Sequence, residues 1–125
     1  MTIITLDPNR VFEVKGEVAP IKSAGGLFLV GNNQAVVTGS TGKKVRVMGW
    51  NAQSDNAAGV VSFLLKSASG GTALMAQITV GASPAIEKQP VVFPGYFETN
   101  SGEGLFVDVI TNGVYLTVFY ILYSA

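Results

Sequence analysis

The chain has 125 residues, enough for one domain whose core stands without disulfides or metals. It contains no Cys and no His, which excludes disulfide frameworks, thiol nucleophiles, Cys/His zinc sites and Ser-His-Asp triads. Charged residues cancel and make up only 13% of the chain, where a soluble domain usually carries about 25%. With no net charge, nothing in the composition attracts nucleic acid or an anionic membrane.

The first predicted element is a short N-terminal arm over residues 1–10. It places Ile3, Ile4 and Leu6 ahead of Asp7-Pro8, and it has neither the basic region nor the apolar run of a signal peptide. We therefore expect the protein to be made in a cytoplasm. Because terminal segments order only when they are tied down, we expect the three apolar side chains to contact a neighbouring subunit or another partner protein.

Residues 11–125 are predicted to form a single antiparallel β-sandwich domain. Alternating or continuous apolar positions, typical of strands, mark residues 12–18, 43–50, 60–65, 72–80, 105–110 and 114–123. Turns rich in Gly and Asn separate these segments about every ten residues, and no segment has a helical apolar period. The Asn112-Gly113 turn predicts that the last two strands pair with each other. The fold class is therefore all-β.

Long segments of the chain carry no charge at all. They cover residues 23–42, 67–86 and 109–125, and they are rich in strand-forming residues rather than in the polar residues of disordered linkers. Solubility normally depends on mixed surface charge. The pattern therefore predicts that part of the surface is buried against a partner.

The last predicted strand is apolar on both faces. Val114, Leu116, Val118, Tyr120 and Leu122 make one face, and Tyr115, Thr117, Phe119, Ile121 and Tyr123 make the other. Two interpretations stay open. Another part of the same chain covers the second face, or Tyr115, Phe119 and Tyr123 contact another subunit, as interface aromatics commonly do.

Patterns that resemble ligand sites have simpler structural explanations. Residues 39–44 look like a phosphate loop, but Val37 and Lys44 stand where that motif needs Gly and Ser or Thr. Glu98, Glu103 and Asp108 lack the spacing of a calcium loop. We expect no catalytic residue, no cofactor and no metal, and we expect the chain not to be an enzyme.

Most of the chain resembles a known family. Residues 94–105 read Pro-Gly-Tyr-Phe-Glu-Thr-Asn-Ser-Gly-Glu-Gly-Leu and lead into two strands joined by Asn-Gly. This pattern is similar to small β-sandwich virion proteins of tailed bacteriophages, and the strands at 45–50 and 59–67 fit the same scheme. The resemblance covers residues 25–125. It implies a jelly-roll-like sandwich that assembles on the virion, often as a capsid decoration or cement protein, with no catalytic residues.

The composition and the resemblance give one expected function and one alternative. The expected function is a decoration protein on the capsid surface, whose partners are the major capsid protein and further copies of itself, a trimer being favoured over a dimer. The alternative is a fibre or tail module that binds host carbohydrate or a receptor. Solvent-exposed aromatics beside polar clusters would favour that alternative.

Overall fold

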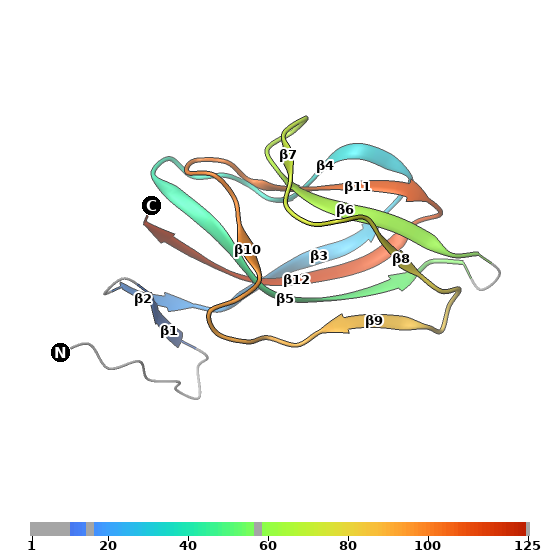
Figure 1. The fold of residues 1–125 in the computed structure, drawn as a ribbon, viewed down its shortest axis with the longest axis horizontal. Helices are drawn as coiled ribbons and strands as arrows, with labels where there is room; N and C mark the ends of the chain where they lie inside the picture. Colours follow the sequence, from blue (N-terminus) through green and yellow to red (C-terminus); the bar gives the residue numbers. More distant parts are fainter. Residues whose placement is uncertain (1–10, 15–16, 57–58, 125) are drawn as a thin grey trace.

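The computed structural model describes residues 11–14, 17–56 and 59–124, and these residues contain strands and no helix (Figure 1). The strands are β1 (Val11–Val14), β2 (Glu17–Pro20), β3 (Lys22–Phe28), β4 (Gly31–Val37), β5 (Lys43–Ser54), β6 (Val61–Ser67), β7 (Thr72–Ala73), β8 (Ile78–Val80), β9 (Ile86–Gln89), β10 (Phe97–Glu98), β11 (Leu105–Thr111) and β12 (Val114–Ser124). The predicted all-β class is confirmed.

Two five-stranded antiparallel sheets pack face to face, as Figure 1 shows. In the first, called the β12 sheet, the order is β10-β5-β12-β3, and β9 also pairs with β5, at residues 50–53. In the second, the β11 sheet, the order is β4-β11-β6-β7, and β8 also pairs with β6. A separate hairpin of β1 and β2 precedes β3. The predicted β-sandwich is therefore confirmed.

The core lies between the two sheets and consists of inward-facing residues of the long strands. Strand β11 alternates buried and half-exposed residues, as expected for a strand with one face in the core. The largest inward residues include Trp50, Phe63, Leu65, Leu105 and Leu116. Trp50 has ring contacts with Tyr96 and Phe97, so the only Trp is a core residue.

The prediction that the last two strands pair with each other was wrong. Strand β11 pairs with β4 and β6, whereas β12 pairs with β5 and β3 in the opposite sheet. Asn112 does adopt a turn conformation, with φ of 54°. However, the Asn112 Nδ2 donates to the Val60 carbonyl at 2.6 Å, and the Gly113 N–H donates to Asp55 Oδ1 at 3.0 Å. These bonds tie the turn to the connection between β5 and β6, so the chain crosses between sheets.

Two predicted strands are divided in the structure. The segment 12–18 belongs to two antiparallel strands, β1 and β2, and the segment 72–80 contains β7 and β8 with an irregular stretch between them. Alternation alone does not show where a strand reverses, because both arms of a hairpin alternate. Among the described residues there is no helix long and apolar enough to span a membrane.

Candidate functional site

The outer face of β12 divides into two halves at a β-bulge. Phe119 lies opposite Gly49 of β5, but the next residue, Tyr120, lies opposite Val47. Met48 is therefore the extra residue on β5. A bulge increases the local twist of a sheet and redirects side chains. Residues after the bulge consequently have different surroundings from residues before it.

The half after the bulge is covered by the chain itself. Ile121 is fully buried, and Tyr123 is only 2% exposed. Their side chains form a second, smaller core with Met48 and with Ala19 of β2, and Ile21 packs against this cluster. The interpretation that another part of the same chain covers the face therefore applies to this half. Tyr123, expected at an interface, lies inside the folded chain.

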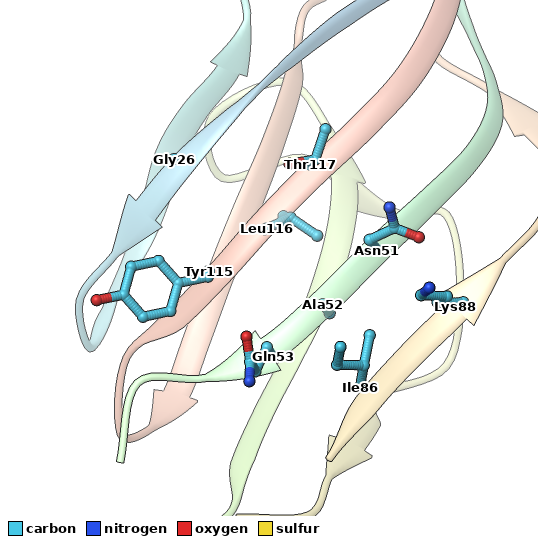
Figure 2. Close-up of a pocket in the computed structure, with 9 residues that line it drawn as sticks. All are labelled: Gly26, Asn51, Ala52, Gln53, Ile86, Lys88, Tyr115, Leu116 and Thr117. Atoms are coloured by element: carbon cyan, nitrogen blue, oxygen red, sulfur yellow. The ribbon is translucent and has the colours of Figure 1, made fainter. Parts of the chain in front are cut away.

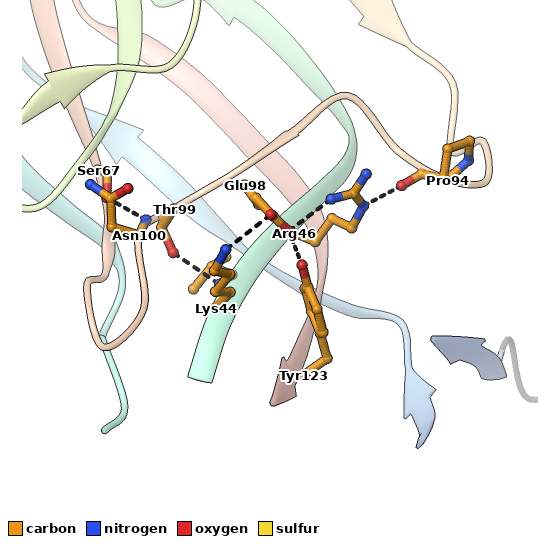
Figure 3. A network of polar contacts seen from close by, with 9 residues as sticks. Lys44, Arg46, Ser67, Pro94, Glu98, Thr99, Asn100 and Tyr123 are labelled. Atoms are coloured by element: carbon orange, nitrogen blue, oxygen red, sulfur yellow. Dashed lines mark hydrogen bonds and ion pairs between the residues drawn. The ribbon is translucent and has the colours of Figure 1, made fainter. Parts of the chain in front are cut away.

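A cluster of polar groups fixes the edge of this covered half (Figure 3). The Glu98 carboxylate on β10 forms two ion pairs. Its Oε1 lies 3.2 Å from the Lys44 Nζ, and its Oε2 lies 2.8 Å from the Arg46 guanidinium. The Tyr123 hydroxyl donates to the same carboxylate, at Oε2. One carboxylate therefore joins β10, β5 and β12, and we call this group the Glu98 cluster.

The segment that contains Glu98 runs along β5. The N–H groups of Tyr96 and Thr99 each donate to a β5 carbonyl at 2.9 Å, and the Val45 N–H donates to Thr99 Oγ1 at 3.0 Å. Gly95 has φ of 93°, and a Cβ there would stand 2.8 Å from the Val47 carbonyl oxygen, so only Gly fits. These contacts attach β10 and its flanking residues to the edge of β5.

A turn at residues 100–103 ends this segment and anchors it to the β11 sheet. The Ser67 hydroxyl donates to Glu103 Oε1 at 2.7 Å and accepts from the Asn100 N–H at 3.0 Å. The Asn100 Nδ2 also donates to Glu103 Oε1, at 2.7 Å. The bond from Ser67, and then the bond from Asn100, hold the pKa of the Glu103 carboxyl below its ordinary value. Within the described ranges, no three acidic residues gather as metal ligands would.

The half before the bulge is open. The strand register places Leu27, Tyr115, Gln53 and Ile86 side by side across β3, β12, β5 and β9. Tyr115 is 52% exposed, Ile86 51% and Leu27 47%. Tyr115, Gln53 and Ile86 line a hollow of about 400 Å³, and Figure 2 shows how these side chains lie on their strands. We call this surface the open face.

The second row of the open face is polar but almost uncharged. It runs from Thr117 on β12 through Asn51 on β5 to Lys88 on β9. In the part of the chain that the structure describes, the side chains of these three residues have no hydrogen-bonding or ionic partner, and neither has the Tyr115 hydroxyl. Their hydrogen-bonding groups are therefore available to a partner or a ligand.

Phe119 lies at the boundary between the two halves. Its side chain is half-buried, and its neighbours in register are Gly49 and Ser23, which leave its ring without a large side chain on either adjacent strand. The structure thus brings Tyr115 and Phe119 onto one side of β12 and separates Tyr123 from them. Ile3, Ile4 and Leu6, the other expected interface residues, lie outside the described residues.

Sequence reasoning missed Leu27 and Ile86 as members of this surface. Leu27 follows Gly25-Gly26, and this pair predicted a turn rather than a strand. Ile86 belongs to a four-residue strand in which charged and apolar residues alternate. That alternation was the available signal for a strand, but four residues are too few to distinguish a strand from a loop. No protein-family model and no curated protein sequence matches the chain.

Proposed function

We propose that the chain is a non-enzymatic virion structural protein of a tailed bacteriophage, a decoration or cement protein of the capsid. The observation that carries the proposal is the open face, where the exposed Leu27, Tyr115 and Ile86 lie in one row with Gln53 and Lys88 is the one charged lining residue. Exposed apolar patches of this kind mark interaction sites. The motif resemblance described above supports the virion context.

The mechanism is passive burial of surface. A protein that binds only the assembled shell stabilises that shell by mass action. The open face supplies contacts between copies of this chain, where low charge and exposed aromatics are favourable. A homo-oligomer is therefore part of the proposal, with a trimer favoured over a dimer.

A second apolar surface is available for the major capsid protein. The loop between β9 and β10 exposes Val91, Val92 and Phe93. A cement protein needs one surface for its own copies and another for the shell, and this loop begins directly after β9, at the margin of the open face. We assign it to the capsid contact, on the outside of the virion.

Sedimentation and capsid binding test this proposal. The purified chain should sediment as an oligomer at micromolar concentration and should co-sediment with capsids that lack it. Tyr115→Lys should abolish the oligomer, whereas Thr72→Lys, at an exposed position of β7 in the other sheet, should not. A chain that sediments only as a monomer of 13.0 kDa and does not bind capsids would overturn the proposal.

A second function is favoured by the polar row of the open face. An exposed Tyr ring can pack on the apolar face of a neutral sugar, and the unpartnered Asn51 and Thr117 can exchange hydrogen bonds with sugar hydroxyls. The chain would then be a fibre or tail module for a host-surface glycan. A glycan array separates the two functions: binding by a monomer that is lost in Tyr115→Ala and kept in Tyr115→Phe would replace the decoration proposal.

A further inference from the structure

The corner between β3 and β4 exposes large apolar side chains. Leu29 is 61% exposed and Val30 60%, more than any other large hydrophobic residue of the described chain. Surface turns are more often built from Gly, Asn, Asp, Pro or Ser. The register places Val109 opposite Gly31, so the exposed Ile110 lies beside Val30 and extends the same surface. We call Leu29, Val30 and Ile110 the apolar corner.

The backbone of the apolar corner is held by a side chain of β4. The Gln34 Nε2 donates to the Leu29 carbonyl at 2.6 Å and to the Gly31 carbonyl at 3.0 Å. One side chain therefore ties the backbone on both sides of Val30. A segment that is already held in place loses less conformational entropy when it binds a partner. The corner consequently has the properties of an interface anchor, which are apolar side chains in a fixed arrangement.

The hollow of the open face is a complementary surface. Its volume of about 400 Å³ lies in the range of sites that enclose a small ligand or an anchoring side chain. Tyr115, Leu116 and Ile86 provide its apolar lining, and Asn51 lies between the strands that carry them (Figure 2). Because Leu29 stays exposed, the apolar corner of a chain does not enter the hollow of the same chain.

The charges beside the two surfaces are opposite in sign. Lys88 is the one charged residue that lines the hollow. The residues that lie on either side of Val114 in register are followed in the chain by Asp55 and Leu29, so the exposed Asp55 stands at the same end of the sheet as the apolar corner. Residues 23–42, which include Leu29 and Val30, have no charge that would repel Lys88. Opposite charges of this kind favour one partner and one orientation.

We propose that the apolar corner of one copy occupies the hollow of a neighbouring copy. The inference rests on the proposed function and names the contact through which the open face is covered. The corner and the hollow are different surfaces of the chain, so the contact is heterologous. Heterologous contacts related by a closing rotation form rings. The contact is therefore compatible with the trimer proposed above.

Two variants test the contact from its two sides. Val30→Asp places a carboxylate on the apolar corner, and Asn51→Arg fills the hollow with a second cation beside Lys88. Each should fold, as judged by circular dichroism, and each should associate about a hundredfold more weakly than wild type, because a charge would be buried without a partner. Val92→Asp makes the same change at an exposed position of the loop between β9 and β10 and should sediment as wild type does.

A mixture of the two variants provides the decisive measurement. Val30→Asp retains an intact hollow, and Asn51→Arg retains an intact apolar corner. Each variant should sediment alone as a monomer, whereas an equimolar mixture should form a 1:1 complex through one intact contact. If open faces met each other instead, Val30→Asp alone would still associate. If corners met each other, Asn51→Arg alone would still associate. Either result would overturn the inference.

Two further results would also overturn it. One is a pair of folded, monomeric variants that do not associate when mixed. The other is a Val30→Asp oligomer that no longer binds capsids, because the corner would then contact the shell. If Val30→Asp does not fold, Val30→Ser adds no charge and should weaken association about tenfold, and unchanged association would count against the contact. An oligomer that persists in Val30→Asp removes this inference alone, whereas a wild-type chain that stays monomeric and does not bind capsids overturns the proposed function as well.

Discussion

The two halves of the outer face of β12 belong to one strand but have opposite surroundings. After the bulge, Ile121 and Tyr123 are enclosed by Met48 and by Ala19 from the hairpin. Before the bulge, Tyr115 has no such cover in the described chain, although it lies in an equally apolar stretch. The covered half shows that this face is stable when something encloses it. The open half has no such enclosure within the described chain, and we expect a partner to cover it.

The difference also separates two roles for aromatic residues with similar spacing. Tyr123 is held in place by Glu98 and contributes to the stability of the monomer. Tyr115 and Phe119 have more exposed side chains than Tyr123, so part of their apolar area stays in contact with water in the single chain. Substitutions in the covered half should therefore lower the free energy of unfolding of the monomer. Substitutions in the open half should instead weaken its association with other copies.

The largest expected effect is on the covered half. Ile121→Ala removes a fully buried side chain and should lower the free energy of unfolding by about 2–5 kcal/mol. Urea unfolding followed by circular dichroism measures it. Tyr115→Ala is the matched control in the open half and should change the monomer's stability by no more than about 0.5 kcal/mol. Equal losses in both variants would show that the two halves do not differ in this way.

A charge at the boundary should affect association instead. In Phe119→Lys the ammonium would be buried without a partner when the open face closes on another copy, at a cost of several kcal/mol. On a solvent-facing strand the same charge costs within about 0.5 kcal/mol. We expect a folded β protein that neither oligomerises nor binds capsids, as measured by analytical ultracentrifugation and co-sedimentation.

Three results with Phe119→Lys lead to different conclusions. Loss of assembly in a folded chain supports the interface, with Thr72→Lys in the other sheet as the charge control. Unchanged oligomerisation and capsid binding would remove Phe119 from the interface. Failure to fold would assign its side chain to the monomer's own core.

Much of the fold could be predicted from the sequence because strand patterns are local. The long strands β5, β6, β11 and β12 overlap predicted segments, and the all-β class followed from them. The pairing of the last two strands could not be predicted from Asn112-Gly113, because contacts with distant Asp55 and Val60 decide it. Strand β3 was missed because Gly25 and Gly26 read as a turn, whereas pairing with β12 keeps them extended.

The candidate surface was only partly predictable for a similar reason. The doubly apolar strand directed attention to β12, but strict alternation assigned Tyr123 the same surroundings as Tyr115, whereas Tyr123 is buried and Tyr115 is exposed. A sequence does not show which half of a face its own chain will enclose. That depends on where the hairpin of β1 and β2 packs, which brings Ala19 against Ile121.

A smaller effect is expected at the Glu98 cluster. Glu98→Gln removes the charge that pairs with Lys44 and Arg46, whose side chains are about a quarter exposed to solvent. We expect a loss of about 1 kcal/mol in the free energy of unfolding, because partly exposed ion pairs contribute modestly. The loss should shrink in high salt, which screens the pairs. Glu87→Gln on β9 is the control, and an equal loss there would argue against a specific role for the cluster.

The smallest expected effect is a pH dependence at the other end of the same segment. Ser67 and Asn100 donate hydrogen bonds to Glu103, so the pKa of its carboxyl is lower in the folded chain than its ordinary value of 4.5. A carboxyl with a lowered folded pKa binds protons more readily in the unfolded chain. Its contribution to stability is therefore complete above pH 4.5 and is lost as the pH falls through the lowered pKa.

Glu103→Gln isolates this contribution, because Gln does not titrate. The free energies of unfolding of wild type and Glu103→Gln should differ at pH 7, and the difference should shrink as the pH falls below 4.5, where the wild-type carboxyl becomes protonated. Because the bonded turn lies on the β11 sheet, oligomerisation through the open face should be the same in both proteins at pH 7. A difference that grew toward low pH would mean that the Ser67 and Asn100 bonds do not favour the ionised carboxyl. A change in association would mean that the turn and the open face are coupled.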